Sequence, residues 1–358
     1  MESEGSTYKM PDVKRKVRVR FRRPSWSEYT VLSNGFINFG DESEVYGKVH
    51  SNTGIHFDGV AYNTISALPA RFDDPDTGGG SLEFGVYTSD DPSAPAYPWP
   101  EGTVPEWPDI FKGGREFPVP EVSFIGVTAD LANIKNQASL SGNYFNADEL
   151  GRRIILKTDG YYDICTVKRA NNNTHAITKY LKNSGSGTCA DCSGACLSTR
   201  QIPNGGVIFV ENDAWVEGSV NNSQVTIVAA NLSGGGSKKN IYIGISDADI
   251  HYAAFDCENK IGLIAQQDIR ILNDCPDEFA IDAALLAQEG TVGINNNVSG
   301  KTSITFNGAV ASYLTPDMQH GGSGFAERIF YFDNSLLYCA PPYFPTGTEY
   351  AIDSWEEL

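Results

Sequence analysis

Short apolar segments separated by polar turns run through most of this 358-residue chain. Four of them end on alanine with a small or amide residue, at residues 227–230, 263–266, 285–288 and 309–312. Their alanines are spaced by 36, 22 and 24 residues: Ala229, Ala265, Ala287 and Ala311. A repeat of this length, rich in β-branched residues, predicts the stacked coils of a β-solenoid, because each coil buries its apolar face only against the next.

A second repeat lies near the N-terminus. The segment 31–40 returns 18 residues later as 49–59, with alternating apolar residues and Ser-Asn-Gly turns. Glycine accepts the positive φ of a tight corner, and asparagine is the next most tolerant residue. We therefore expect the solenoid to begin here, with slightly shorter coils.

Residues 71–120 have a different character. Proline, aspartate and glycine crowd this segment, and Trp99 and Trp107 lie among the prolines. A long irregular excursion of this kind is often functional or mobile. Asp73, Asp74 and Asp76 are candidate calcium ligands, but their spacing is not that of an EF-hand and favours a solvated acidic loop.

The next part of the chain mixes helix and strand signals. A helix is predicted over residues 130–139, because three apolar residues fall on one face: Leu131, Ile134 and Ala138. Residues 153–157 and 161–167 flank an Asp-Gly pair, which predicts a β-hairpin. Residues 168–203 are polar and cysteine-rich, as in a loop closed by disulfides.

These patterns predict an all-β protein: a right-handed parallel β-helix (β-solenoid) with a long proline-rich loop and a small α+β insertion. The right hand follows the general preference of crossover connections. The chain divides into a basic strand or leader, the first coils, the insertion, the main coils, and the C-terminal strands and tail: 1–26, 27–70, 71–202, 203–325 and 326–358.

Composition supports this picture. Charged residues make up 20% of the chain and aromatic residues 11%, with 36 glycines, which is typical of a turn-rich β protein rather than a disordered one. The net charge of −18 argues against nucleic-acid partners. Residues 1–23 are the exception, because they hold eight basic residues and three acidic ones. We expect a basic edge strand that docks on or near the acidic body; a membrane-surface or nucleic-acid arm is the alternative.

Targeting signals are missing from the sequence as given. No run approaches the roughly 18 apolar residues of a membrane helix, and residues 1–4 are not the start of a signal peptide. A basic strand without an export signal suggests an N-terminal fragment that lacks an upstream anchor. Membrane contact is expected only through that anchor.

Cysteines point to an oxidising compartment. Six of the seven are disulfide candidates: Cys165, Cys189, Cys192, Cys196, Cys257 and Cys275. The cluster at 189–196 has metal-like spacing but no second pair or nearby histidine, so disulfides are favoured over free thiols or a metal. Cys257 and Cys275 are separated by about one coil and are expected to pair, which leaves Cys339 unpaired. Loop disulfides predict an extracellular or cell-surface protein.

No catalytic, cofactor or metal site is predicted, and we expect no enzyme. The sequence lacks a nucleophile elbow and nucleotide-binding glycine patterns. None of the histidines has metal-binding spacing: His50, His56, His175, His251 and His320. The alternative, a carbohydrate-active β-helix enzyme, would need acidic and basic groups gathered on one sheet face. Its candidates are Asp247, Asp249, Asp268, Asp282 and Arg270.

Segments 49–55, 215–218, 281–288 and 354–358 resemble PilX-like proteins, a family of type IV pilus assembly or pilus-associated proteins of candidate-phylum bacteria. The resemblance implies a non-catalytic, surface-exposed structural or adhesive role. It also implies partners among other pilus or cell-surface proteins and surface glycans. The exposed sheet faces and the loops rich in tryptophan and proline are the expected contact surfaces.

The coil repeats also resemble bactofilins, which are cytoplasmic polymers built from one β-solenoid. Bactofilins are shorter and poor in cysteine, and this chain departs from them in both respects. A bactofilin-like polymer stays as the second alternative, and it predicts uncapped terminal coils and reduced cysteines.

Overall fold

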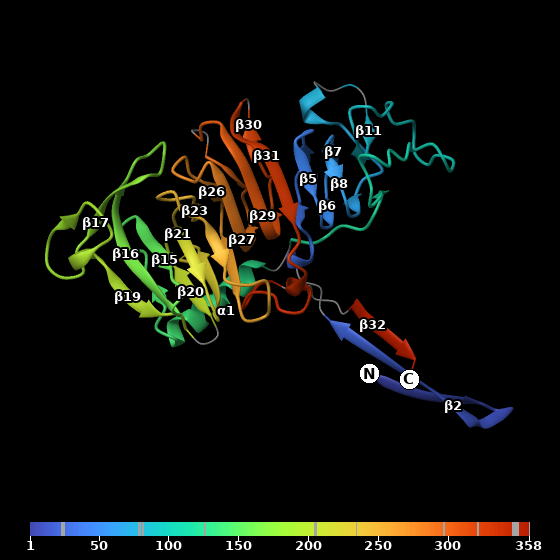
Figure 1. Ribbon diagram of the computed structural model, residues 1–358, viewed down its shortest axis with the longest axis horizontal. Coiled ribbons are helices and arrows are strands. Elements are labelled where there is room, and N and C mark those ends of the chain that lie inside the picture. The colour runs from blue at the N-terminus through green and yellow to red at the C-terminus, as the bar shows by residue number, and fades with distance from the viewer. Residues whose placement is uncertain are drawn as a thin grey trace.

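The computed structural model describes residues 1–22, 26–77, 80, 82–124, 127–203, 206–233, 235–295, 298–320, 322–345 and 351–357. Within these residues the chain is all-β, with a large sheet of mostly parallel strands and one α-helix, α1 (Val127–Leu140). Figure 1 shows the strands stacked along the long axis of the molecule, while the terminal strands project away from this body.

One ladder of parallel strands begins at β14 and takes its next members in chain order. These are β14 (Tyr144–Phe145), β20 (Val207–Val210), β22 (Gln224–Ala229), β25 (Lys260–Ala265), β27 (Glu278–Ala287) and β29 (Lys301–Ser312). The ladder then continues onto strands from the N-terminal part of the chain: β3 (Val31–Ser33), β6 (Val49–Ser51), β9 (Ile65–Ala67) and β13 (Arg115–Glu116).

Further parallel ladders lie beside the first. One joins β15 (Gly151–Leu156), β21 (Asp213–Val220), β23 (Ile241–Ile243), β26 (Ile269–Ile271) and β28 (Val292–Ile294). Another runs from β21 through β24 (Ile250–Tyr252), β27, β29, β31 (Ser323–Tyr331), β5 (Ser43–Val45) and β8 (Val60–Ala61). A separate three-stranded parallel sheet contains β4 (Ile37–Phe39), β7 (Ile55–Phe57) and β12 (Val86–Tyr87).

The order of the strands in space differs from the order that the sequence predicts. The first coils were expected to precede the main coils, with the insertion between them. Instead, β3 and β5 pair with β29 and β31, so the first coils follow the last ones. The segment between β9 and β14 then carries the chain from one end of the stack to the other.

The predicted division of the chain shifts accordingly. β14 and β15 lie within the predicted insertion at 71–202, yet they pair in parallel with β20 and β21. β31 runs past the predicted end of the main coils at 325 and pairs with β29. For β14 and β15 the parallel partners begin more than 50 residues later in the chain, so the local pattern could not assign the two strands to this sheet.

A row of small, fully buried residues marks one corner of successive coils. The register aligns Ala229, Ala265, Ala287, Ser312, Ser33, Ser51 and Ala67, all 0% exposed. In the fourth predicted run, residues 309–312, the prediction is wrong by one residue. Ala311 pairs with Leu286, and Ser312 takes the place beside Ala287 that was expected for Ala311. Serine is accommodated here since its hydroxyl caps the turn: Ser51 Oγ accepts hydrogen bonds from the backbone N–H groups of Thr53 and Gly54, at 3.0 and 2.9 Å.

An aliphatic row fills the interior next to this corner. Its members are Ile208, Ile227, Leu263, Leu285, Val310, Val31, Val49 and Ile65, and each is buried. Burying a side chain of this size contributes about 1.5–3 kcal/mol relative to exposure. Stacking of the parallel strands therefore supplies a core that no single strand contains.

The opposite face of the same ladder is covered as well. Helix α1 packs Leu131, Ile134 and Ala138 against it, which confirms the predicted helical face. Trp26 and Leu336, from 3₁₀ helices at Trp26–Glu28 and Asn334–Leu337, extend the cover. A sheet buried on both faces has nearly continuous apolar strands, which explains why these runs do not alternate.

The basic N-terminal strand has an acidic partner at the other end of the chain. β1 (Glu2–Thr7), β2 (Met10–Arg22) and β32 (Ala351–Glu357) form an antiparallel sheet. Arg18 lies 2.8 Å from Glu2 and 2.9 Å from Glu356, with all three side chains solvent-exposed. The expected docking on the acidic body is thus replaced by pairing with β32, away from the body (Figure 1).

Candidate functional site

A line of polar and aromatic side chains crosses the outer face of the ladder that contains β24, β27, β29, β31, β5 and β8. Asp282, Asn307 and Tyr331 are successive partners in its register. Tyr46 and Tyr62 continue the line, since each follows the last residue of its strand and those last residues pair with each other. We name this set the polar row: His251, Asp282, Asn307, Tyr331, Tyr46 and Tyr62.

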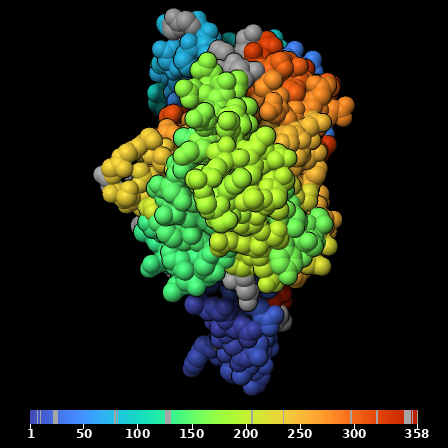
Figure 2. Space-filling view, turned by 90° about the vertical axis from the view of Figure 1, so that its left-hand side faces the viewer, coloured from blue at the N-terminus to red at the C-terminus, as the bar shows by residue number. Residues whose placement is uncertain are grey.

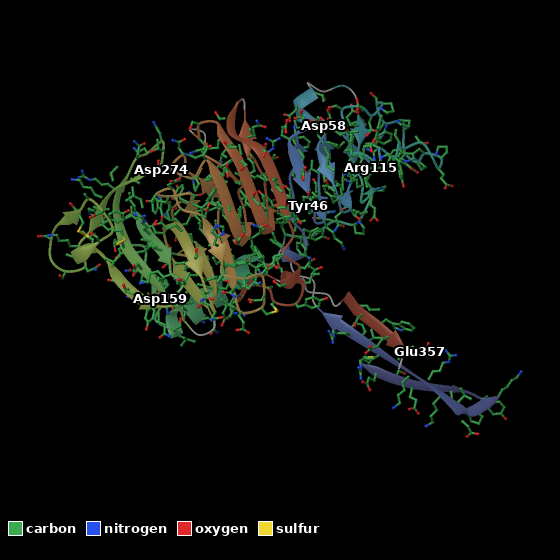
Figure 3. The ribbon with its side chains drawn as sticks, viewed as in Figure 1. Tyr46, Asp58, Arg115, Asp159, Asp274 and Glu357 are labelled. Atoms are coloured by element: carbon green, nitrogen blue, oxygen red, sulfur yellow. A yellow bond between two sulfur atoms is a disulfide. The ribbon has the colours of Figure 1, made fainter. Side chains whose placement is uncertain are left out.

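Three stacked tyrosines form one half of the polar row. The ring of Tyr46, labelled in Figure 3, lies 4.3 Å from that of Tyr62 and 4.7 Å from that of Tyr331, with interplanar angles of 4° and 23°. Tyr62 and Tyr331 are each 40% exposed. The Nζ atom of Lys112 lies 4.4 Å above the Tyr62 ring and adds a cation–π contact. Tyrosine offers large contact area at low entropic cost, which makes such a row suited to binding.

The hydroxyl group of Tyr46 is held as a hydrogen-bond donor. Tyr46 Oη donates to Glu44 Oε2 at 2.7 Å. This hydrogen bond raises the pKa of Tyr46 above its ordinary value, because the neutral phenol is the donor. The row therefore presents the neutral hydroxyl of Tyr46 beside the Glu44 carboxylate, next to apolar rings.

The other half of the polar row is an acidic group around one histidine. Asp282 is buried and accepts hydrogen bonds from His251 Nδ1 at 2.8 Å, Asn307 Nδ2 at 2.7 Å and the backbone N–H of Tyr252 at 3.2 Å. Asp249 Oδ2 lies 3.3 Å from His251 Nε2. Burial lowers the pKa of His251, but its hydrogen bond to Asp282 and the two negative charges outweigh burial and raise the pKa above its ordinary value.

The acid/base candidates for an enzyme divide into two groups. Asp249 and Asp282 meet at His251, as just described. Asp268 lies on another ladder, where its carboxylate accepts from Arg270 at 3.1 Å and from the backbone N–H of Thr291 at 2.9 Å. Asp247 is exposed, with its backbone N–H bonded to the carbonyl of Asp274. Most of these carboxylates are satisfied by structural donors, a pattern typical of strand ends.

The other histidines make local contacts. His50 is buried rather than on the coil surface, with ring nitrogens 3.0 Å from Ser66 Oγ and 2.9 Å from Asn52 Oδ1. His56 stacks on Tyr87 at 4.4 Å and lies 3.0 Å from Ser89 Oγ. In the described part of the chain, no group of three or more histidine, cysteine or acidic side chains is arranged to hold a metal.

The proline-rich segment packs its aromatic residues inward. Phe84 and Phe117 enclose Trp99, and Trp107 Nε1 donates to Asp91 Oδ1 at 2.7 Å. Arg115, labelled in Figure 3, forms a buried ion pair with the same carboxylate at 2.5 Å. The two tryptophans expected to contact partners are therefore used to hold the segment together.

The candidate calcium ligands in this segment do not converge. Asp74 is fully buried and accepts hydrogen bonds from Tyr87 Oη and from the backbone N–H of Asp76 at 2.7 Å. Asp76 is exposed and accepts from Asn38 Nδ2 at 3.0 Å, while Asp73 faces solvent. The interpretation of a wholly solvated acidic loop is wrong for Asp74, because its carboxylate anchors the loop to β12.

Two disulfides close the cysteine-rich segment over one end of the stack. They join Cys165 to Cys192 and Cys189 to Cys196. The predicted hairpin around residues 158–160 is confirmed by antiparallel pairing of β15 with β16 (Tyr161–Ala170). β17 (Ile177–Leu181), β18 (Thr188–Cys189) and β19 (Ser198–Gln201) complete the segment. Figure 2 shows this green to yellow-green part covering the end of the molecule.

The third disulfide contradicts the predicted pairing. Cys257 bonds to Cys339, and Cys275 is free and buried, so the pairing of Cys257 with Cys275 is wrong. Cys275 belongs to the interior cluster, whereas Cys257 lies in a loop that reaches the C-terminal segment. Burial raises the pKa of Cys275 to about 11, so its thiol is protonated and unreactive. Three disulfides are typical of extracellular or other oxidising environments.

Comparison with known proteins adds little to this description. No family model matches the chain, and no curated protein matches it. Among solved structures, the chain is similar to the competence-associated pilin ComZ from Thermus thermophilus, with 12% identity and a TM-score of 0.36, over 100% of this chain and 80% of that chain. None of the described helices is long and apolar enough to cross a membrane. The resemblance to PilX-like proteins therefore gains no family model and no curated relative.

Proposed function

We propose that this protein is a non-catalytic, surface-exposed structural or adhesive component, and that the polar row binds a surface glycan. The stacked tyrosines carry the proposal: Tyr46 and Tyr62 follow neighbouring strands of the N-terminal part, and Tyr331 joins their line from a strand that is distant in the chain. Apolar ring edges beside phenol hydroxyls and a carboxylate suit a sugar, which offers C–H groups and hydroxyls together. The association with type IV pili rests on the resemblance to PilX-like proteins.

The proposal includes the architecture. We infer that the parallel ladders are the coils of a right-handed parallel β-helix. The support is the repeated register, in which β22, β25, β27 and β29 align residue for residue over successive repeats. Such a scaffold holds a straight, rigid row of side chains on its outer face, which an adhesive surface needs.

Glycan-array binding tests the function. We expect the protein to bind a subset of surface glycans, and Tyr46→Ala to abolish binding because it removes the ring at the centre of the stack. Tyr8→Ala is the matched control, since Tyr8 is fully exposed in the β1–β2 turn. An array without binding, or equal binding by Tyr46→Ala and the unaltered protein, would contradict the proposal.

A carbohydrate-active enzyme is the second candidate, favoured by the contact of Asp249 and Asp282 with His251. An assay for cleavage of acidic polysaccharides separates the two. Turnover that His251→Ala abolishes would replace the adhesive function with an enzymatic one.

A bactofilin-like polymer receives less support. Polymerisation needs free strand edges at the ends of the stack. At one end β16 pairs with β15 in antiparallel orientation and is covered by the disulfide-closed segment, and at the other end the proline-rich segment supplies β12 and β13. Filaments of the purified protein in electron micrographs would favour the polymer.

A further inference from the structure

A cavity opens where the first coils meet the last ones. Its volume is about 730 Å³, within the range of small-molecule sites. The ladder of β28 continues only as a single bridge from Gly293 to Asp317, and β4 pairs instead with β7. The interior is thus accessible beside β4. The cavity's apolar wall contains Phe36, Phe39, Met318 and Phe330.

Two arginines line the cavity: Arg270, whose Nη2 lies 3.1 Å from Asp268 Oδ2, and Arg328. Arg328 is 6% exposed. Its Nε donates to Ser43 Oγ at 3.1 Å, and its Nη1 donates to Gln319 Oε1 at 2.7 Å and to two backbone carbonyls. All of these acceptors are neutral. Among the described residues, no carboxylate lies within 4.0 Å of this guanidinium.

The second terminal nitrogen of Arg328 is the available donor. Among the described residues Nη2 has no hydrogen-bond acceptor, and it lies 3.3 Å from where a Cβ on Gly40 would stand. Gly40 also lines the cavity, and its missing side chain leaves this approach open. Gln319 accepts through Oε1, so its Nε2 is a second donor beside the guanidinium.

Burial without a counterion is costly for a cation. Burial lowers the pKa of Arg328 despite the attraction of Asp41 and Glu42. Buried charges in proteins are ordinarily paired, because the desolvation of an isolated ion is uncompensated. The polar end of the cavity therefore contains a buried cation without an anionic partner, and the wall beside it is apolar.

We propose that this cavity binds a small monocarboxylate with an apolar or ring-shaped body. The carboxylate accepts hydrogen bonds from Arg328 Nη2 and Gln319 Nε2, and the body packs on the phenylalanine rings. The rim includes Asp76 and Asp317, which repel a second negative charge and thereby select against phosphate. The site lies apart from the polar row, so it does not depend on the proposed glycan binding.

Isothermal titration calorimetry of the full chain tests the site with four probes: phenylacetate, glucuronate, 2-phenylethanol and inorganic phosphate. We expect phenylacetate or glucuronate to bind with a Kd below about 1 mM. Phenylacetate alone would indicate an apolar carboxylate as the source, and glucuronate alone an acidic sugar. Absence of binding by both, or equal binding of 2-phenylethanol or phosphate, would overturn the proposal.

Two variants complete the test. Arg328→Gln should weaken carboxylate binding by about tenfold or more. Asp76→Asn keeps the fold, because Asp76 is exposed on the rim, and it should strengthen carboxylate binding severalfold by removing a negative charge. If Arg328→Gln fails to fold, the affinity of Asp76→Asn decides whether the site binds an anion. A ligand whose affinity does not change when the negative charge of Asp76 is removed is not bound as an anion. Unchanged affinity in either folded variant would contradict the site.

Discussion

The two segments that interrupt the coils are stabilised in different ways. The proline-rich segment, residues 71–120, is held by inward aromatic rings and the buried pair of Arg115 with Asp91. The cysteine-rich segment, residues 168–203, is held by two disulfides, one of them to Cys165 of β16, beside a small apolar cluster around Tyr180 and Trp215. A long segment with only a few short strands needs its own core or covalent links, and this chain uses one solution at each end of the stack.

These two modes of stabilisation differ in how visible they are in the amino-acid sequence. Cysteines are visible as letters, and their clustering predicted a closed loop. The aromatic core of the proline-rich segment has no such signal, and its tryptophans were interpreted as surface contacts. The four predictions below separate the two modes of stabilisation, beginning with the largest effect.

Removal of the Asp91 carboxylate should be the most damaging change. Asp91→Ala leaves the guanidinium of Arg115 buried without its partner and removes the acceptor of Trp107 Nε1. We expect a loss of about 3–5 kcal/mol in the free energy of unfolding, measured by urea denaturation. Asp90→Ala is the matched control, since Asp90 is exposed next to it, and should change little. A loss below about 1 kcal/mol for Asp91→Ala would mean that the rings alone hold the segment.

Removal of the disulfides should lower the free energy of unfolding by a smaller amount, and the loss should be larger for the longer loop. The Cys165–Cys192 bond spans 27 residues, and its removal by paired alanine substitutions should cost about 3.5 kcal/mol. The Cys189–Cys196 bond spans 7 residues and should cost about 2.4 kcal/mol. Thermal unfolding of both variants measures the difference. A larger loss from the shorter loop would show that packing in the apolar cluster dominates.

Acidification should have effects of opposite sign at two carboxylates, Asp58, which binds the proline-rich segment, and Glu217 in β21. Burial raises the pKa of Asp58, but hydrogen bonds from Ser89 and Thr88 outweigh it and lower the pKa below the ordinary value. Its stabilisation of the proline-rich segment is present above the unfolded pKa of about 3.9 and is lost as pH falls through the lower folded pKa. Burial raises the pKa of Glu217, and the charge of Arg153 only partly offsets this. Protonation of Glu217 therefore favours the folded state, and stability at this site increases as pH falls.

Hydrogen exchange above and below about pH 4 measures this contrast. The amide of Ser89 donates to Asp58 at 2.8 Å and should lose protection in acid. Strand β21, which contains Glu217, should keep its protection. Equal loss at both places would indicate global unfolding and would contradict opposite signs.

The smallest effect is expected at the surface of the proline-rich segment. Lys112→Ala removes the cation above the Tyr62 ring and should cost about 0.5 kcal/mol, measured by urea denaturation. Lys168→Ala in the cysteine-rich segment removes a solvent-exposed ion pair with Glu149 and serves as the comparison, also at about 0.5 kcal/mol. A loss of several kcal/mol from Lys112→Ala would show that the polar row contributes to folding as well as to binding.

Parts of the candidate site could be read from the sequence. Asp249 and Asp282 are among the acid/base candidates predicted from the sequence, whereas Tyr46 and Tyr62 lie outside the repeated segments 31–40 and 49–59 and were not predicted. Tyr331 could not be assigned to the same line, because nothing in the order of the chain places β31 against β5. Arg328 gave no signal either, since its neighbours in the sequence are ordinary strand residues.

The sequence by itself determined the local structure. The spacing of Ala229, Ala265 and Ala287 predicted the strands and their register, because a corner of a coil admits only small residues. The apolar face of α1 and the Asp-Gly hairpin followed from periodicity and turn chemistry, which act over a few residues.

Only the tertiary structure decided which coils are neighbours. Backbone edges of parallel strands are alike whatever their position in the chain, so the local pattern did not determine whether β29 would pair with β3. That pairing aligns Tyr331 with Tyr46 and opens the cavity beside Arg328. The cysteine pairing of Cys257 with Cys339 has the same origin, since it depends on where the C-terminal segment returns to the stack.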